Sequence, residues 1–173
     1  HWIALNKFDE EYVPTQGVDF ASKVFDYNGS QIKYQFWDSS GSEGCRSSLL
    51  ASYLSDTDVV FAMYDITSPN SFRSIQEFRF SELCTKPDVK VFLIGNKFDL
   101  AKSRAVSVEQ ARAFARDNGY FFCEISLKSA TNVDQLMHSV SAALHASHTD
   151  TDFLVKTQPM SDCSDELTFT VSS

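Results

Sequence analysis

Residues 89–100 read Val-Lys-Val-Phe-Leu-Ile-Gly-Asn-Lys-Phe-Asp-Leu and carry the clearest signal for the fold class of this chain. The first half of the stretch is a nearly continuous apolar run rich in β-branched and aromatic residues, which is typical of a strand covered on both faces within a parallel sheet. The second half turns polar at Asn96, Lys97 and Asp99. Because ligands bind beyond the carboxyl ends of the strands in open α/β sheets, these side chains stand where a ligand would bind.

The carboxylate of Asp99 narrows the class of ligand. Its two acceptor oxygens match a ring that presents two adjacent N–H donors, and guanine has such an edge whereas adenine does not. A polar loop that caps a buried strand is the alternative, and the four-residue pattern Asn96-Lys97-Phe98-Asp99 by itself leaves both interpretations open.

Strand and helix patterns alternate on both sides of this stretch. Residues 19–27 and 30–37 predict two strands, and Asn28-Gly29 between them is a strong signal for an antiparallel hairpin. Further strands are predicted at 59–64, 89–94 and 120–125, and helices at 45–54, 69–84, 107–119 and 133–144. The order predicts an α/β fold, doubly wound, with a mostly parallel sheet and an antiparallel edge hairpin.

Composition and charge indicate one globular domain with an acidic end. The 173 residues are 43% hydrophobic, without an apolar run near the ~20 residues of a membrane span. The net charge of −8 argues against a nucleic-acid groove. Half of that excess lies in residues 149–173, which contain five acidic residues and one lysine. We therefore expect a folded domain over 1–148 and an acidic, flexible tail over 149–173. Four cysteines without a Cys-x-x-Cys pair predict reduced thiols and a cytoplasmic protein.

Four ordered stretches resemble the motifs of Ras-like small GTPases. Residues 12–20, Tyr-Val-Pro-Thr-Gln-Gly-Val-Asp-Phe, resemble the first switch, and 37–43, Trp-Asp-Ser-Ser-Gly-Ser-Glu, resemble the Trp-Asp-Thr-Ala-Gly-Gln-Glu segment. Residues 96–99 resemble the base-reading motif, and 124–128, Glu-Ile-Ser-Leu-Lys, resemble the final Glu-Thr-Ser-Ala-Lys. The Gly-Val-Asp-Phe of 17–20 and the Met-Tyr-Asp-Ile-Thr of 63–67 point to the Rab branch. The resemblance covers residues 8–145, and four motifs in order are far more specific than one.

The resemblance implies a site for the phosphates of GTP or GDP and for Mg²⁺. Thr15 would bind Mg²⁺ through its hydroxyl and the γ-phosphate through its N–H, Asp38 would hold Mg²⁺ through water, and the Gly41 N–H would contact the γ-phosphate. Ser42 stands where the family has the glutamine that orients the attacking water. Because serine is too short to reach that water, we expect GTP hydrolysis to be slow.

The resemblance also implies a guanine site. Its expected members are the residues that contact the base or support the base loop: Phe8, Asn96, Lys97, Asp99, Ser126, Leu127 and Lys128. Asn96 and Asp99 would grip the base, the Lys97 stem and Phe8 would pack on it, and the Leu127 N–H would meet its carbonyl. Ser126 and Lys128 would support the loop.

Three aromatic residues, Phe20, Trp37 and Tyr53, resemble the surface by which Rabs contact effectors. Ordinary packing beneath the switches would account equally well for any one of them.

Two family features are absent from the sequence as given. A phosphate loop needs Gly-x-x-x-x-Gly-Lys-Ser/Thr, but the glycines stand at 17, 29, 41, 44, 95 and 119, and no two are five apart. Counting back from Thr15 places that loop, with the first strand of the domain, ahead of residue 1, so we expect an N-terminally incomplete fragment. Cys163 is the only tail cysteine, and the ending Thr-Val-Ser-Ser is no prenylation box.

Two functions therefore remain open at the level of sequence. One is a guanine-nucleotide-dependent switch in vesicle traffic, which would meet effector, exchange and GTPase-activating proteins and reach endomembranes from the cytoplasm through such partners. The other is a GTPase-like interaction module that does not cycle GTP. Thr15 and the base-reading motif favour the first, whereas Ser42, Leu127 and the missing phosphate loop favour the second.

Overall fold

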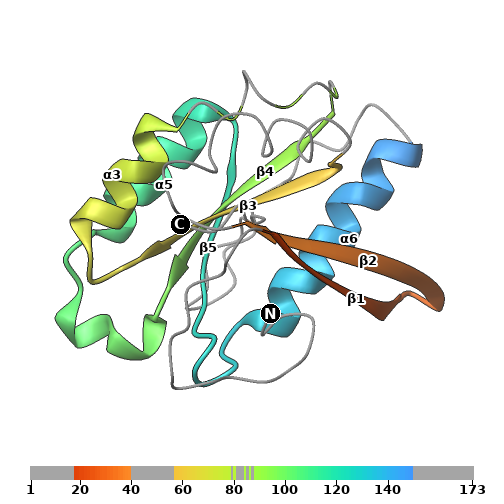
Figure 1. Ribbon diagram of the computed structural model, residues 1–173, viewed down its shortest axis with the longest axis horizontal. Helices are drawn as coiled ribbons and strands as arrows, with labels where there is room; N and C mark the ends of the chain where they lie inside the picture. The colour runs from red at the N-terminus through yellow and green to blue at the C-terminus, as the bar shows by residue number, and fades with distance from the viewer. Residues whose placement is uncertain are drawn as a thin grey trace.

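The computed structural model describes residues 18–39, 57–78, 80, 84, 86 and 88–149. Within them, strands and helices follow the order β1 (Val18–Tyr27), β2 (Ser30–Ser39), β3 (Val59–Asp65), α3 (Pro69–Glu77), β4 (Lys90–Asn96), the 3-10 helix η2 (Phe98–Ser103), α5 (Val108–Asn118), β5 (Phe121–Glu124) and α6 (Val133–Thr149) (Figure 1). Each predicted strand is present, and the helix predicted at 45–54 lies outside the described residues.

The hairpin forms as the Asn-Gly turn predicts. Asn28 and Gly29 have φ values of 51° and 80°, and such left-handed dihedrals at both central residues match the right-handed twist of the flanking strands. The Gly29 N–H donates to Asp26 Oδ1 at 3.1 Å. On the inner face Tyr34 is buried, and its hydroxyl bonds to Ser141 Oγ of α6 at 2.7 Å. The hairpin is thus fastened to the last helix by packing and one buried hydrogen bond.

The apolar run that begins at Val89 forms β4, the middle strand of the three-stranded parallel sheet. β4 pairs with β3 on one side and with β5 on the other, both in parallel. Four consecutive residues of β4, Phe92 to Gly95, are buried. A strand with neighbours on both edges and cover on both faces explains the continuous apolar run.

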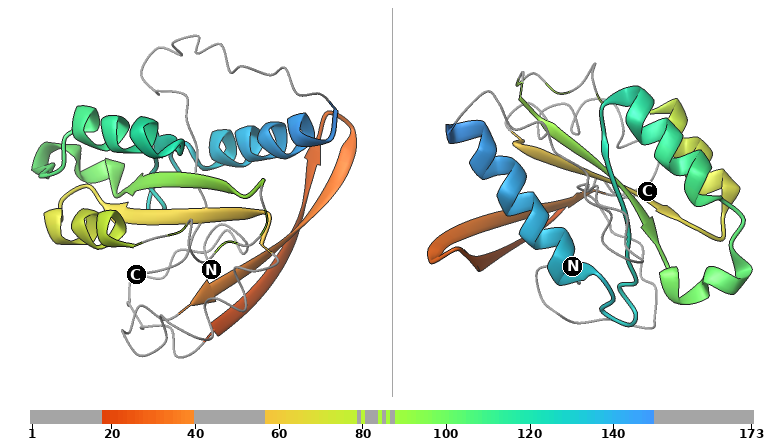
Figure 2. Two further views of the ribbon diagram at one scale, coloured as in Figure 1. Left: turned by 90° about the horizontal axis from the view of Figure 1, so that it is seen from above. Right: turned by 180° about the vertical axis from the view of Figure 1, so that it is seen from behind.

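Helices cover both faces of this sheet, as the doubly wound prediction requires. One core cluster joins the parallel strands to α3 and α5, through residues such as Phe72 and Ala111. The other joins the opposite face to α6 and the hairpin, through residues such as Met137 and Tyr34. Figures 1 and 2 show α3 and α5 side by side at one end of the molecule and α6 beside the hairpin at the other. No described helix is long and apolar enough to cross a membrane.

One prediction about these elements is wrong in detail. The helix predicted over 69–84 ends at Glu77, because Phe78 turns to an extended conformation (φ −85°, ψ 124°) and its ring packs 4.4 Å from that of Phe80. The antiparallel hairpin is present as predicted, and within the described residues β1 and β2 form a sheet of their own. Side chains rather than backbone hydrogen bonds connect the two sheets there.

Candidate functional site

The carboxyl ends of the three parallel strands are bonded to one another through the backbone. Ile66 N–H, just beyond β3, donates to Asn96 O at 3.1 Å, and Ile125 N–H, just beyond β5, donates to Gly95 O at 2.9 Å. The Phe98 N–H at the start of η2 donates to Ile125 O at 3.0 Å. These bonds hold the loops after β4 and β5 against each other, so the predicted base-reading residues share one edge of the sheet.

Asp99 and Ser126 meet at this edge. The Ser126 hydroxyl donates to Asp99 Oδ1 at 2.5 Å and accepts the Ser129 N–H at 3.1 Å. Ser126 is fully buried whereas Asp99 is exposed, so the serine fixes the carboxylate from beneath. Each carboxylate oxygen can accept more than one hydrogen bond, which leaves Asp99 able to receive two adjacent N–H donors from solvent.

Asn96 and Leu127 form a second contact between the same two loops. The Leu127 N–H donates to Asn96 Oδ1 at 3.2 Å. This is the N–H that the family resemblance assigns to the guanine carbonyl, and no local sequence pattern predicted its hydrogen bond to Asn96. A base bound here would share or displace that bond.

Lys97 is held by a residue outside the base-reading motif. It adopts a left-handed conformation (φ 66°), and its Nζ lies 2.7 Å from Asp65 Oδ2 at the end of β3. Asp65 Oδ1 accepts the Thr67 N–H at 2.8 Å and the Thr67 hydroxyl at 2.7 Å. Burial alone would raise the pKa of Asp65, but the hydrogen bonds from Lys97 and Thr67 outweigh it and lower that pKa. Asp65 is therefore a carboxylate that fixes the lysine ammonium at the edge of the site.

A second ion pair lies beneath the loops. Arg104 Nη1 and Nη2 donate to Glu124 Oε1 and Oε2 at 2.5 and 2.6 Å, and Glu124 is largely buried. Gly95 makes room for it, because a methyl group at position 95 would lie 3.1 Å from Glu124 Cγ and 2.9 Å from Ile66 Cγ2 and Tyr64 Oη. The motif 124–128 includes Glu124, but no local pattern identified Arg104 or Asp65 as its neighbours in this site.

Two of the three aromatic residues predicted to contact effectors lie together on the hairpin. Phe20 and Trp37 are cross-strand partners with ring centroids 4.7 Å apart, and they are 46% and 45% exposed. Both rings are thus half-exposed on the hairpin, and their role as an effector surface stays a prediction. Tyr53 lies outside the described residues.

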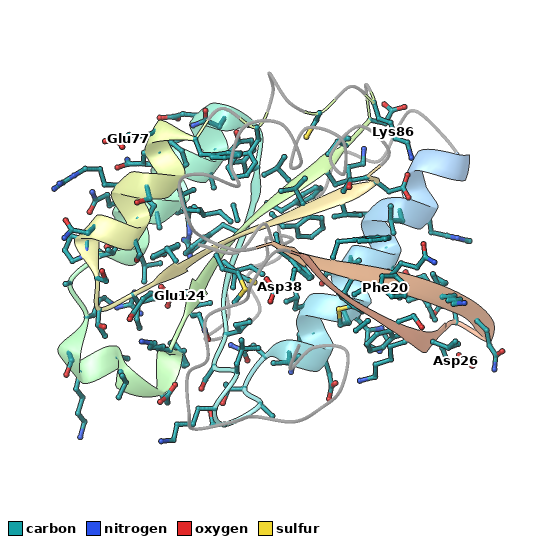
Figure 3. The ribbon with its side chains drawn as sticks, in the orientation of Figure 1. Phe20, Asp26, Asp38, Glu77, Lys86 and Glu124 are labelled. Atoms are coloured by element: carbon teal, nitrogen blue, oxygen red, sulfur yellow. The ribbon has the colours of Figure 1, made fainter. Side chains whose placement is uncertain are left out.

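Other predicted residues are placed only partly. Asp38 is half-buried in β2, and Figure 3 shows it at the end of the hairpin nearest the parallel strands, whereas Asp26 lies at the far tip. Lys128 is exposed in the turn after Leu127. The predictions at Phe8, Thr15, Gly41 and Ser42 fall on residues outside the described ranges. Among the residues that are described, no group of three or more His, Cys, Asp or Glu side chains could hold a metal ion.

The assembled edge presents acceptors of the kind that a purine with donors on one side would need. Asp99 presents a fixed carboxylate, Asn96 presents an amide, and the Lys97 stem stands beside them. A carboxylate discriminates in favour of two adjacent N–H groups and against a ring acceptor at the same position. Guanine meets that requirement.

The sequence is similar to those of known proteins. The model of the Ras family matches residues 3–146. The "Ras-related protein RABD2a" of Arabidopsis thaliana is 36% identical over 141 residues, which cover 80% of this chain and 68% of that protein. The "Ras-related protein Rab-26" of Bos taurus is 38% identical over 140 residues, which cover 80% of this chain and 54% of that protein. The chain thus spans little more than half the length of the second relative.

Proposed function

This chain belongs to the Ras family of small GTPases and is of the Rab type, and from that membership we propose that it acts as a guanine-nucleotide-dependent switch in intracellular vesicle traffic. The observation that supports the proposal most directly is the base site assembled by Asp99, Ser126, Asn96 and Leu127. The buried Ser126 hydroxyl holds the exposed Asp99 carboxylate in place, which is the preorganisation that recognition of two adjacent N–H donors would need.

The switch would follow from the phosphates. GTP or GDP would bind with Mg²⁺, with Thr15, Asp38 and Gly41 on the phosphate side and the β4 and β5 loops on the base side. The γ-phosphate would order the segments around Thr15 and Gly41, and the exposed Phe20–Trp37 pair would report that state to effectors. Exchange and GTPase-activating proteins would reset the switch, and partner contacts would recruit the protein from the cytoplasm to endomembranes.

Hydrolysis in this proposal is slow. Catalysis of phosphoryl transfer consists of positioning and charge stabilisation, so a residue that aligns water lowers the barrier without covalent chemistry. Ser42 is too short to do so, and an activating partner would have to supply the water-orienting group. In a chain joined to a phosphate loop, Ser42→Gln should accelerate single-turnover hydrolysis, and equal rates would show that Ser42 is not the limitation.

Base selectivity of the 173-residue protein tests the proposal. We expect guanosine at millimolar concentration to shift the amide resonances of Leu127 and Ser129 in NMR spectra, and adenosine to leave them unchanged. Asp99→Asn presents one donor and one acceptor, which match xanthine and mismatch guanine, so preference should move from guanosine to xanthosine. Asp58→Asn, at the opposite end of β3, should retain guanosine selectivity. Equal responses to guanosine and adenosine would refute guanine recognition.

The same protein should lack tight affinity for Mg·GTP, because the 173 residues contain no Gly-x-x-x-x-Gly-Lys-Ser/Thr loop and base contacts alone must offset desolvation of a polyanion. Titration with a fluorescent GTP analogue measures this affinity. Tight, magnesium-dependent binding would show that other residues cradle the phosphates.

Delivery to membranes tests the role in traffic. A fluorescent fusion of the protein should co-localise with endomembranes, and Trp37→Ala should reduce that association. Val24→Ala on the same strand pair provides the control, because Val24 is exposed but lies away from the Phe20–Trp37 contact. If the wild type and Trp37→Ala were distributed equally, the Phe20–Trp37 pair would have no role in recruiting the protein to membranes.

A further inference from the structure

We propose that the Arg104–Glu124 ion pair is a positioning device for the base site: it fixes the loop that carries Asp99 and the loop that carries Ser126 at the separation that guanine recognition requires. This inference deepens the proposed function and rests on it for its guanine part. Neither residue points to solvent as a base contact would, and both act through their neighbours.

The geometry of the ion pair fixes both the distance and the relative orientation of the Arg104 and Glu124 side chains. The two guanidinium nitrogens Nη1 and Nη2 face the two carboxylate oxygens at 2.5 and 2.6 Å. The side chains are 21% and 9% exposed, so the contact is shielded from most of the solvent screening that weakens surface pairs. A planar fork on a carboxylate permits one relative orientation, whereas a lysine ammonium would permit many.

The two residues stand immediately beside the loops that they would position. Arg104 directly follows η2, which carries Asp99, and Glu124 ends β5 two residues ahead of Ser126. Three hydrogen bonds already join these loops at the base edge: Ser126 Oγ to Asp99, Leu127 N–H to Asn96 and Phe98 N–H to Ile125 O. The ion pair joins them at a separate point, away from that edge. Bonds confined to one edge would let the loops pivot about it, whereas a further connection at a separate point fixes their mutual orientation.

Each end of the pair is itself anchored. Arg104 Nη1 also donates to Val106 O at 3.2 Å, and the Val106 N–H donates to Ile66 O at 3.0 Å beyond β3. At the other end, Asn132 Nδ2 donates to Glu124 O at 2.8 Å from the start of α6. The pair therefore transmits the position of the rigid sheet and helix to the two loops.

Packing at Gly95 explains how the Glu124 side chain can lie so close to β4. A Cβ atom at position 95 would come within 3.1 Å of Glu124 Cγ, so only glycine leaves room for this side chain. Gly95 directly precedes Asn96, so the carboxylate lies beneath the strand end that carries the base-reading residues. A pair that merely stabilised the core would not need to span the two loops that form one binding edge.

Amide hydrogen exchange of the 173-residue protein tests the positioning without any nucleotide. Glu124→Gln keeps the size of the side chain but removes its charge, and Arg104→Lys keeps the charge but removes the fork. Both variants should accelerate exchange of the Leu127 and Ser129 amides by about tenfold or more, the loss expected for a hydrogen bond to a charged group. Amides in the β1–β2 hairpin should keep their wild-type exchange rates.

Two controls separate positioning from stability. Asp58→Asn breaks the exposed Lys86–Asp58 pair, and Tyr34→Phe removes the buried bond between the hairpin and α6; neither lies at the base edge. Neither control should change the Leu127 and Ser129 amides relative to the rest of the protein. The double variant Arg104→Met/Glu124→Leu extends the test, because an apolar pair can restore stability but has no directional fork. We expect its thermal midpoint to recover while the loop amides remain fast.

Guanosine titration by NMR then distinguishes failure of this inference from failure of the proposed function. Weaker guanosine binding by Glu124→Gln and Arg104→Lys, together with fast loop amides, supports the inference. Wild-type exchange rates and wild-type guanosine binding in both variants overturn it and leave guanine recognition intact. If guanosine shifts no resonance of the wild-type protein, guanine recognition is overturned. Faster exchange confined to the Leu127 and Ser129 amides of the variants would then support only the statement that the ion pair couples the two loops.

Discussion

Two buried tyrosines, Tyr34 and Tyr64, differ in whether the hydroxyl makes a hydrogen bond within the described part of the chain. Replacement by phenylalanine should therefore change the stability of the protein in opposite directions at the two positions. Tyr34 is 7% exposed and its hydroxyl bonds to Ser141 Oγ at 2.7 Å. Because the Ser141 hydroxyl donates its own proton to Met137 O at 2.9 Å, Tyr34 must be the donor. Tyr64 is 2% exposed, and its hydroxyl has no hydrogen-bond partner among the described residues. Tyr→Phe should therefore destabilise at position 34 and stabilise at position 64.

The magnitudes follow from the two environments. Loss of a made hydrogen bond costs about 1 kcal/mol, and removal of a buried hydroxyl that makes none relieves a desolvation penalty of about 1 kcal/mol or more. The two variants should thus differ by about 2 kcal/mol, which separates their thermal midpoints by roughly 4–8 °C in a domain of this size.

Thermal and urea unfolding of the wild type and both variants at neutral pH measures the difference. Burial, with the nearby Glu124 charge, raises the pKa of Tyr64 far above its usual value. The folded protein therefore retains a proton that an unfolded tyrosine releases above about pH 10, so the stability of the wild type falls as pH rises beyond that point. Tyr64→Phe lacks this loss, and its advantage should widen there. A Tyr64→Phe variant less stable than the wild type would refute the assignment of an unsatisfied hydroxyl.

Three further substitutions test the site and the helix boundary. Asp65→Asn removes a carboxylate whose pKa is lowered, so urea unfolding should show a loss of about 1 kcal/mol above pH 4, and the variant should lose less stability than the wild type as pH falls through the folded pKa. Gly95→Ala should lower the free energy of unfolding by about 1–3 kcal/mol through overpacking. Tyr64→Phe should reduce that loss, because it removes the hydroxyl oxygen 2.9 Å from the new methyl group. If the two substitutions were strictly additive in a double-mutant cycle, the contact would be contradicted. Ser107→Ala removes the N-cap of α5 and should lower the free energy of unfolding by about 1 kcal/mol. An unchanged thermal midpoint would contradict the contribution of the cap.

Local chemistry predicted the elements whose signals lie within a few residues. Asn28-Gly29 requires two left-handed residues in a tight turn, and the turn adopts them. Ser107 caps α5 by accepting the Gln110 N–H, and Gly119 ends the helix with φ 69°. The apolar run in 89–94 predicted a strand with both faces covered, and its place between two neighbours follows from that requirement.

Features that depend on distant parts of the chain could not be predicted in this way. The end of α3 at Glu77 depends on how Phe78 and Phe80 enter the core, and the helical periodicity continued past that point. The separation of the hairpin from the parallel sheet is a property of strand order, which side-chain patterns do not encode. Arg104 and Glu124 are 20 residues apart on different elements, so only the folded chain places them together.

The internal bonds of the base site bear on how strongly it could bind. Asp99 is bonded to Ser126, Asn96 to the Leu127 N–H and Lys97 to Asp65, so each polar side chain already has a partner before a ligand arrives. A base that enters therefore exchanges one set of hydrogen bonds for another, and only the surplus appears as affinity. Because its side chains are already ordered, such a site would lose little conformational entropy when a base binds. It would also discriminate between bases, because a ring with the wrong donors would break the internal hydrogen bonds and form none in their place. We infer that this edge contributes selectivity, and that tight binding would have to come from contacts to the phosphates.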